Sequence, residues 1–177
     1  MKIVILFASP NSNGSTSILV NSFKSGAQES GHSVEIIDVC RLKISPCTGC
    51  VACGYEGECV QHDDNGKIRN SLLSCDMVVF ATPLYYYGMS AQLKAVIDRF
   101  CAYNSSLNRR HLKSALLAVA WNTADWTFEA LSVHYKTLVR YIGLEDMGMV
   151  LGFGCGTPSM ARSGKYPKAA YDLGRSL

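Results

Sequence analysis

The sequence predicts a doubly wound α/β fold, in which helices cover both faces of a five-stranded parallel sheet with the strand order 2-1-3-4-5. Short apolar runs alternate along the chain with segments whose apolar residues recur at helical spacing. The runs are nearly continuous, as expected for parallel strands buried on both faces. No internal repeat interrupts this pattern. The expected strands cover residues 2–8, 33–39, 76–81, 115–120 and 147–153.

Each expected element rests on its own residues. The run KIVILFA at residues 2–8 is apolar after its lysine, which suits a central strand, and DMVVFA at residues 76–81 reads the same way. Asp63 and Asp64 open a short helix, where acidic groups suit the helix dipole. Leu93, Val96, Ile97, Phe100 and Cys101 mark one face of another helix. The expected helices cover residues 16–29, 63–73, 93–101, 131–142 and 167–177.

Length and composition limit the possible classes of protein. At 177 residues, a single domain over residues 1–177 is expected. The net charge is +3 with acids and bases interspersed, so no nucleic-acid partner is expected. The apolar start of the chain stops at Ser9 and Pro10, which is too short for a signal peptide or a membrane span. We therefore expect a cytoplasmic protein without a membrane partner.

The loop after the first strand contains the features of an anion site. Residues 9–16 read SPNSNGST and open directly onto a helix, whose unpaired amides and dipole favour negative charge. No lysine follows Gly14, so the loop does not match those that bind nucleoside triphosphates. A terminal monophosphate held by neutral donors fits better. The alternative is a loop that only caps the helix.

Two aromatic loops are expected at the same edge of the sheet. Residues 82–90 read TPLYYYGMS, and three tyrosines before a glycine suit a flat tricyclic ring; the alternative is packing against a partner subunit. Residues 121–126 read WNTADW and follow the fourth strand. This loop adds Asn122 and Thr123 as candidate cofactor contacts, with a plain aromatic-rich turn as the alternative.

Four cysteines form a compact C-x2-C-x2-C-x5-C motif between the second strand and the helix that starts at Asp63. Thiolates at this spacing turn toward one small centre, as in cubane iron–sulfur sites. Zinc is a rival, although zinc sites more often use two separated pairs of ligands. A segment without metal is the third alternative. The candidate ligands are Cys47, Cys50, Cys53 and Cys59, whereas Cys40, Cys75, Cys101 and Cys155 are expected to be scattered inert thiols.

The loop SPNSNGST and the stretch TPLYYYGMSAQLKAVIDRF together resemble the flavodoxin-like NAD(P)H-dependent FMN reductases. The cysteine motif followed by Val60 and Asp63-Asp64 resembles the subgroup that includes the iron–sulfur flavoproteins. The resemblance implies a flavodoxin-like three-layer sandwich that binds FMN, with a possible [4Fe-4S] cluster on the four cysteines. It implies an FMN phosphate held by Ser9, Asn11, Ser15, Thr16 and Ser17, and an isoalloxazine lined by Pro83, Leu84, Tyr85, Tyr86, Tyr87 and Gly88.

The activity implied by the resemblance is electron transfer from NAD(P)H through FMN to a flavin, a quinone or another small acceptor. No side chain is expected to act as an acid or a base, since the cofactor carries the difficult chemistry. Most of the four histidines are expected to be solvated, and they form no catalytic set. A second hypothesis is an iron–sulfur flavoprotein that accepts electrons from a ferredoxin. A homodimer or homotetramer is expected, because the tyrosine loop is too apolar to leave bare.

Overall fold

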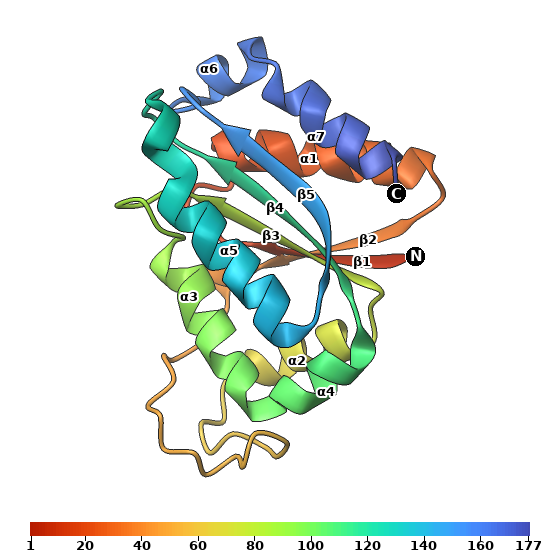
Figure 1. The fold of residues 1–177 in the computed structure, drawn as a ribbon, viewed down its shortest axis with the longest axis vertical. Helices are drawn as coiled ribbons and strands as arrows, with labels where there is room; N and C mark the ends of the chain where they lie inside the picture. Colours follow the sequence, from red (N-terminus) through yellow and green to blue (C-terminus); the bar gives the residue numbers. More distant parts are fainter.

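The computed structural model describes residues 1–177, and its sheet has five parallel strands in the order β2-β1-β3-β4-β5. This order confirms the prediction from the sequence (Figure 1). The strands are β1 (Lys2–Phe7), β2 (Ser33–Asp38), β3 (Met77–Pro83), β4 (Lys113–Val119) and β5 (Glu145–Gly152).

The central strands are buried because their apolar residues face a helical layer on either side. Every residue of β3 is buried, whereas β2 has no fully buried residue and forms one edge of the sheet. In the parallel register, Phe7 pairs with Ala81, and Pro83 pairs with Val119. The loops after β1, β3 and β4 therefore start beside one another at the carboxyl edge of the sheet, where ligands bind in this architecture.

Helices cover the two faces of the sheet around separate hydrophobic clusters (Figure 1). On one face, the buried residues of α1, α6 and α7 pack against β1, β3 and β4. The other face carries α2, α3, α4, α5 and the 3-10 helix η2. The elements of the first face are α1 (Ser15–Glu29), α6 (Pro158–Ser163) and α7 (Tyr166–Arg175); those of the second are α2 (Asn65–Leu73), α3 (Ala91–Asp98), η2 (Arg99–Tyr103), α4 (Asn104–Arg110) and α5 (Glu129–Ile142).

Two glycines bring α1 and α7 into backbone contact. A Cβ atom at Gly26 would lie 2.1 Å from the carbonyl oxygen of Tyr171, and one at Gly174 would lie 2.2 Å from that of Phe23. Neither position has room for a methyl group. The close approach packs α7 against the C-terminal half of α1, the helix whose N-terminus opens at the candidate phosphate loop.

The structure adds elements that the sequence did not predict. Helices α4 and α6 were not expected, because each is short and buries one residue, Leu107 and Ala161 respectively. The expected helix over residues 93–101 continues beyond α3 as η2. Short 3-10 helices also follow β2 as η1 (Val39–Arg41) and precede α5 as η3 (Asp125–Phe128).

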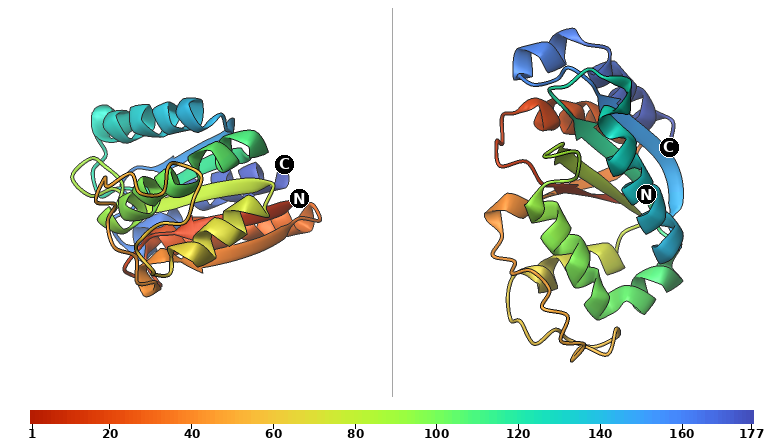
Figure 2. Two further views of the ribbon diagram at one scale, coloured as in Figure 1. Left: turned by 90° about the horizontal axis from the view of Figure 1, so that it is seen from below. Right: turned by 60° about the vertical axis from the view of Figure 1, so that its left-hand side comes forward.

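The segment between η1 and α2 is a long loop that carries the cysteine motif. It extends beyond the helical layer near α3 and α4, as Figure 1 and the right-hand view of Figure 2 show. None of the helices is both long enough and apolar enough to span a membrane.

Candidate functional site

A cavity of about 250 Å³ opens at the carboxyl edge of the sheet, between the loops after β1, β3, β4 and β5. Seven of the thirteen predicted cofactor-binding residues line it: Ser9, Asn11, Ser15, Thr16, Pro83, Leu84 and Tyr85. The other lining residues are Gly14, Val119, Ala120, Trp121, Cys155, Gly156 and Pro158. We call this space the switch-point cavity, because it lies where the strand order reverses direction from β1 to β3.

The first turn of α1 presents neutral donors to the switch-point cavity. The N-cap residue Gly14 has no side chain to accept from the first amides, which leaves them open to a bound anion. Thr16 is 1% exposed and Ser15 is 8% exposed, and no hydrogen bond within the chain uses either hydroxyl. The hydroxyl of Ser17 is different, because it donates to the carbonyl of Gly14 over 2.7 Å and does not line the cavity.

The tyrosine loop, residues 82–90, forms a tight turn in which two tyrosines adopt an unusual backbone conformation. Tyr85 and Gly88 exchange two backbone hydrogen bonds of 3.0 Å. Between them, Tyr86 and Tyr87 have φ angles of 45° and 62°. Left-handed conformations are rare for bulky residues and concentrate at ligand sites. The glycine of this loop therefore does not supply the unusual backbone conformation.

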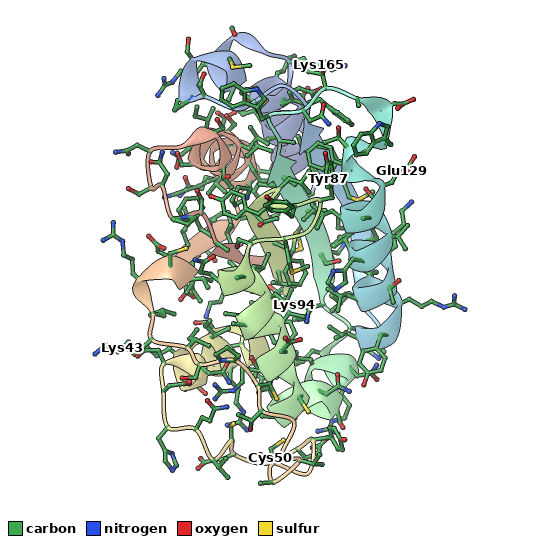
Figure 3. The ribbon with its side chains drawn as sticks, turned by 90° about the vertical axis from the view of Figure 1, so that its left-hand side faces the viewer. Lys43, Cys50, Tyr87, Lys94, Glu129 and Lys165 are labelled. Carbon is green, nitrogen blue, oxygen red and sulfur yellow. The ribbon has the colours of Figure 1, made fainter.

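Beyond the cavity, the tyrosine loop is part of an exposed aromatic surface formed by Tyr85, Tyr86, Tyr87, Trp121 and Trp126. The rings of Tyr87 and Trp126 are 4.9 Å apart, which joins the loop after β3 to the loop after β4. Tyr86 is fully exposed. Figure 3 shows Tyr87 near the start of α3. Tyr86, Tyr87 and Gly88 lie outside the cavity lining.

In the loop after β4, the structure brings Trp121 to the cavity and leaves Asn122 and Thr123 outside it. The side-chain oxygen of Asn122 accepts from the amides of Thr123 and Ala124, so it is used within its own loop. Trp121 lies directly on Gly156, where a Cβ atom would come within 2.0 Å of the indole. A tryptophan at a strand end is a usable signal in sequence, but its contact with Gly156 depends on the tertiary fold.

The cysteine motif lines a second cavity of about 240 Å³. Cys47, Cys50, Cys53 and Cys59 all border it, and Cys101 of η2 is a fifth cysteine in the same lining. Cys101 was expected to be buried apart from the motif, and the structure instead places it, half-buried, beside the motif cysteines. Burial raises the pKa of Cys101, and the nearby Cys53 thiol adds to that shift. We call this space the cysteine cavity.

The thiols of the cysteine cavity are not gathered around a single point. Among residues 1–177, no three side chains of histidine, cysteine, aspartate or glutamate are arranged to hold one metal ion. The arrangement of the side chains therefore does not distinguish zinc from a cluster at the motif. Cys50 is the most exposed of the five thiols, and hydrogen bonds from the Ala52 amide and the Thr48 side chain lower its pKa.

A buried ion pair closes the base of the cysteine segment. Arg99 binds Asp63 through two hydrogen bonds of 2.7 and 3.2 Å. Burial raises the pKa of Asp63, but the hydrogen bonds from Arg99 and from two backbone amides outweigh it and hold that pKa below its usual range. At the outer edge of the segment, Glu56 forms an exposed bidentate pair with Arg109 of α4.

The other cysteines and one histidine are buried or half-buried outside the cysteine cavity. Cys75 and Cys155 are buried as expected, and burial raises the pKa of Cys75 to about 11. Cys40 is half-buried. His134 is half-buried, and burial together with nearby Lys94 lowers its pKa.

Comparison with known proteins identifies the family. Residues 1–146 match the model of the NADPH-dependent FMN reductases. The chain belongs to this family of flavoprotein oxidoreductases. An iron-sulfur flavoprotein of Archaeoglobus fulgidus is 29% identical over 154 residues, which cover 87% of this chain and 69% of the relative. An iron-sulfur flavoprotein of Methanocaldococcus jannaschii is 34% identical over 99 residues, which cover 56% of this chain and 51% of the relative.

A further relative matches over a larger share of its own length. A Bacillus subtilis protein named as an NAD(P)H-dependent FMN-containing oxidoreductase is 27% identical and covers 87% of this chain and 86% of the relative. Most curated iron-sulfur flavoproteins that the chain matches are about twice as long as the matched part.

Solved structures show the same flavodoxin-like fold. The NAD(P)H:quinone oxidoreductase from Methanothermobacter marburgensis superimposes with a TM-score of 0.81 at 22% identity, covering 100% of this chain and 96% of that chain. A flavodoxin from the domain Archaea gives a TM-score of 0.63 at 13% identity, covering 99% and 95%. These likenesses establish the architecture, and the family rests on the sequence match.

Proposed function

We propose that this chain is an FMN-dependent oxidoreductase that takes electrons from NAD(P)H and passes them to a flavin, a quinone or another small acceptor. The observation that carries the proposal is the switch-point cavity, in which an uncapped helix N-terminus and aromatic side chains meet. The helix N-terminus suits a phosphate, and the aromatic side chains suit a flat ring. FMN contains both groups on one molecule.

The chain offers distinct residues to each end of the cofactor. The amides of the first turn of α1 and the hydroxyls of Ser15 and Thr16 would bind the phosphate, with Ser9 and Asn11 beside them. Tyr85 and Trp121 would flank the ring and exclude water from one side of it. FMN would supply the hydride and single-electron chemistry of the reaction.

The side chains of the switch-point cavity provide no general acid or base. Its lining contains no carboxylate, histidine, lysine or arginine. Its titratable groups are Tyr85 and Cys155, and burial raises the pKa of the Cys155 thiol. These residues therefore bind and orient, consistent with a reaction whose chemistry resides in the cofactor.

We further propose a [4Fe-4S] cluster on Cys47, Cys50, Cys53 and Cys59. Two observations support it: the four thiols border one cavity, and the curated relatives at 29% and 34% identity are named iron-sulfur flavoproteins. A cubane is larger than a single ion, so its ligands need not meet at one point. The cluster would supply one-electron transfer, which favours a ferredoxin donor as the second candidate function.

The exposed aromatic surface supports a homodimer or a homotetramer as the working assembly. Five large aromatic side chains are gathered there, and contiguous apolar patches of this kind mark interaction sites. Sedimentation of the FMN-bound protein at micromolar concentration tests this part. A monomer under those conditions would contradict it.

Anaerobic purification followed by cofactor analysis tests the proposed function. We expect FMN in the protein, oxidation of NADH or NADPH with a quinone or free flavin as acceptor, and iron with acid-labile sulfide at about four per chain. If the reconstituted protein binds FMN and oxidises NAD(P)H but contains no iron, the proposed oxidoreductase activity stands and the proposed cluster is contradicted. A protein that binds no FMN would contradict the main proposal.

A further inference from the structure

We infer that Arg99 is the positioning residue of the cysteine segment and that its charge sets the reduction potential of the cluster bound there. The second half of this inference rests on the proposed cluster, whereas the first half rests on the chain alone. Arg99 belongs to η2. It is neither one of the thirteen expected cofactor-binding residues nor one of the four expected metal ligands.

Arg99 holds both ends of the cysteine segment. Its side chain is 1% exposed, and one terminal nitrogen donates to the carbonyl of Ser45 over 2.8 Å. The other donates to the carbonyl of Gln61 over 3.2 Å. The segment between these two residues contains all four cysteines of the motif. One guanidinium therefore fixes the entry and the exit of the loop.

Asp63 completes this anchor. Its carboxylate binds the same guanidinium twice and also accepts from the amides of Ser45 and Asn65, each over 3.0 Å. Ser45 is thus held through its carbonyl by Arg99 and through its amide by Asp63. Breaking such a pair by removing one partner is costly, because the remaining charge is left without compensation.

The same guanidinium lies against the cysteine cavity. Arg99 and Cys59 both line that cavity and also the adjoining one of about 200 Å³. The Nε atom of Arg99 is buried without a hydrogen-bond partner. The other charged or titratable groups of the adjoining cavity are Glu58, His62, Asp63, Arg69 and Tyr103. A buried positive charge therefore lies beside one proposed cluster ligand.

This charge has a defined effect on a redox centre. Reduction adds one negative charge to a cluster, so a nearby cation favours the reduced form and a nearby anion opposes it. Arg99→Gln should therefore lower the reduction potential, and Asp63→Asn should raise it. A purely structural anchor would shift both potentials in the same direction, or neither, because both variants break the same pair.

Potentiometric titration of the anaerobically reconstituted protein measures the reduction potential of the cluster and tests the electrostatic role of Arg99. The variants are Arg99→Gln, Arg99→Lys, Asp63→Asn and the control Asp64→Asn, whose carboxylate accepts from the Lys43 amide and pairs with exposed Lys67. We expect opposite shifts for Arg99→Gln and Asp63→Asn, and potentials close to the wild type for Arg99→Lys and Asp64→Asn. Unchanged potentials or shifts of one sign, at full iron content, would overturn the electrostatic role.

Hydrogen exchange of the cluster-free protein tests the anchor separately. Arg99→Gln should accelerate exchange of the amides between Ser45 and Gln61 by at least tenfold, and Asp64→Asn should not. Equal exchange in Arg99→Gln and the wild type would overturn the positioning role. A wild-type protein that takes up no iron would overturn the proposed cluster and with it the role in the potential, while the exchange result would still decide the anchor.

Discussion

The hydroxyl of Ser90 donates a hydrogen bond of 2.8 Å to the carbonyl of Ala8, at the end of β1. The amide of Ser90 in turn donates to the hydroxyl of Thr82 over 2.9 Å, and all three groups are buried. These bonds join the residue that precedes the loop after β1 to both ends of the tyrosine loop. The two loops that contribute most of the predicted cofactor-binding residues are therefore linked directly to each other.

Replacing Ser90 with alanine should remove the side-chain hydrogen bond between the two loops. The variant leaves the Ala8 carbonyl buried without its partner and removes the oxygen that accepts from the Leu93 amide at the start of α3. We expect a loss of about 2 kcal/mol in the free energy of unfolding and a weaker affinity for FMN. Urea denaturation and calorimetric titration measure the two effects. Thr137→Ala, which removes an exposed hydroxyl bond to Val133, should change neither.

Replacing Ser15 and Thr16 together with alanine should weaken FMN binding by about 1–3 kcal/mol, the range for lost hydrogen bonds to a charged group. Ser17→Ala is the matched comparison, since its hydroxyl is already bonded to Gly14. We expect a much smaller effect from that variant in titration calorimetry. Equal losses from both variants would show that the hydroxyls facing the cavity have no special role.

The conformation of Tyr86 predicts two effects of opposite sign. Asparagine tolerates the left-handed region better than tyrosine, so Tyr86→Asn should stabilise the isolated chain by about 1 kcal/mol. The same change removes a fully exposed ring from the aromatic surface, so it should weaken self-association. Chemical denaturation and sedimentation measure the two effects. Tyr141→Asn on the exposed face of α5 is the control and should not stabilise the protein.

The ion pair between Asp63 and Arg99 predicts a dependence on pH. The pKa of Asp63 is lowered in the folded protein, so its contribution to stability is present above its unfolded pKa of about 3.9 and is lost as the pH falls through the lower, folded value. Asp63→Asn should destabilise the protein by about 3 kcal/mol at pH 7. The difference from the wild type should shrink in denaturation experiments below about pH 4. A difference independent of pH would contradict this assignment.

The strands and the main helices could be predicted because their signals are local. Continuous apolar runs marked β1 and β3, and helical spacing marked α3 and α5. The loops after the strands could be placed as well, since the carboxyl ends of parallel strands share one edge. The contacts of Ser9, Thr16 and Tyr85 with the switch-point cavity follow from that geometry.

The remaining features depend on contacts between distant residues. Cys101 reaches the cysteine cavity from η2, and Arg99 reaches Asp63 across 36 positions, so no local pattern indicates either. The left-handed backbone conformation of Tyr86 and Tyr87 could not be predicted either. From the sequence alone, that conformation would be assigned to the neighbouring Gly88. Trp121 lines the cavity whereas its neighbour Asn122 does not, and the local sequence does not distinguish the two positions.

A crystal structure of the chain with FMN tests the central claim most directly. We expect the phosphate within hydrogen-bond distance of the amides and hydroxyls of Ser15 and Thr16, and the ring system in contact with Tyr85 and Trp121. FMN bound at any other position, with the switch-point cavity left open, would contradict it.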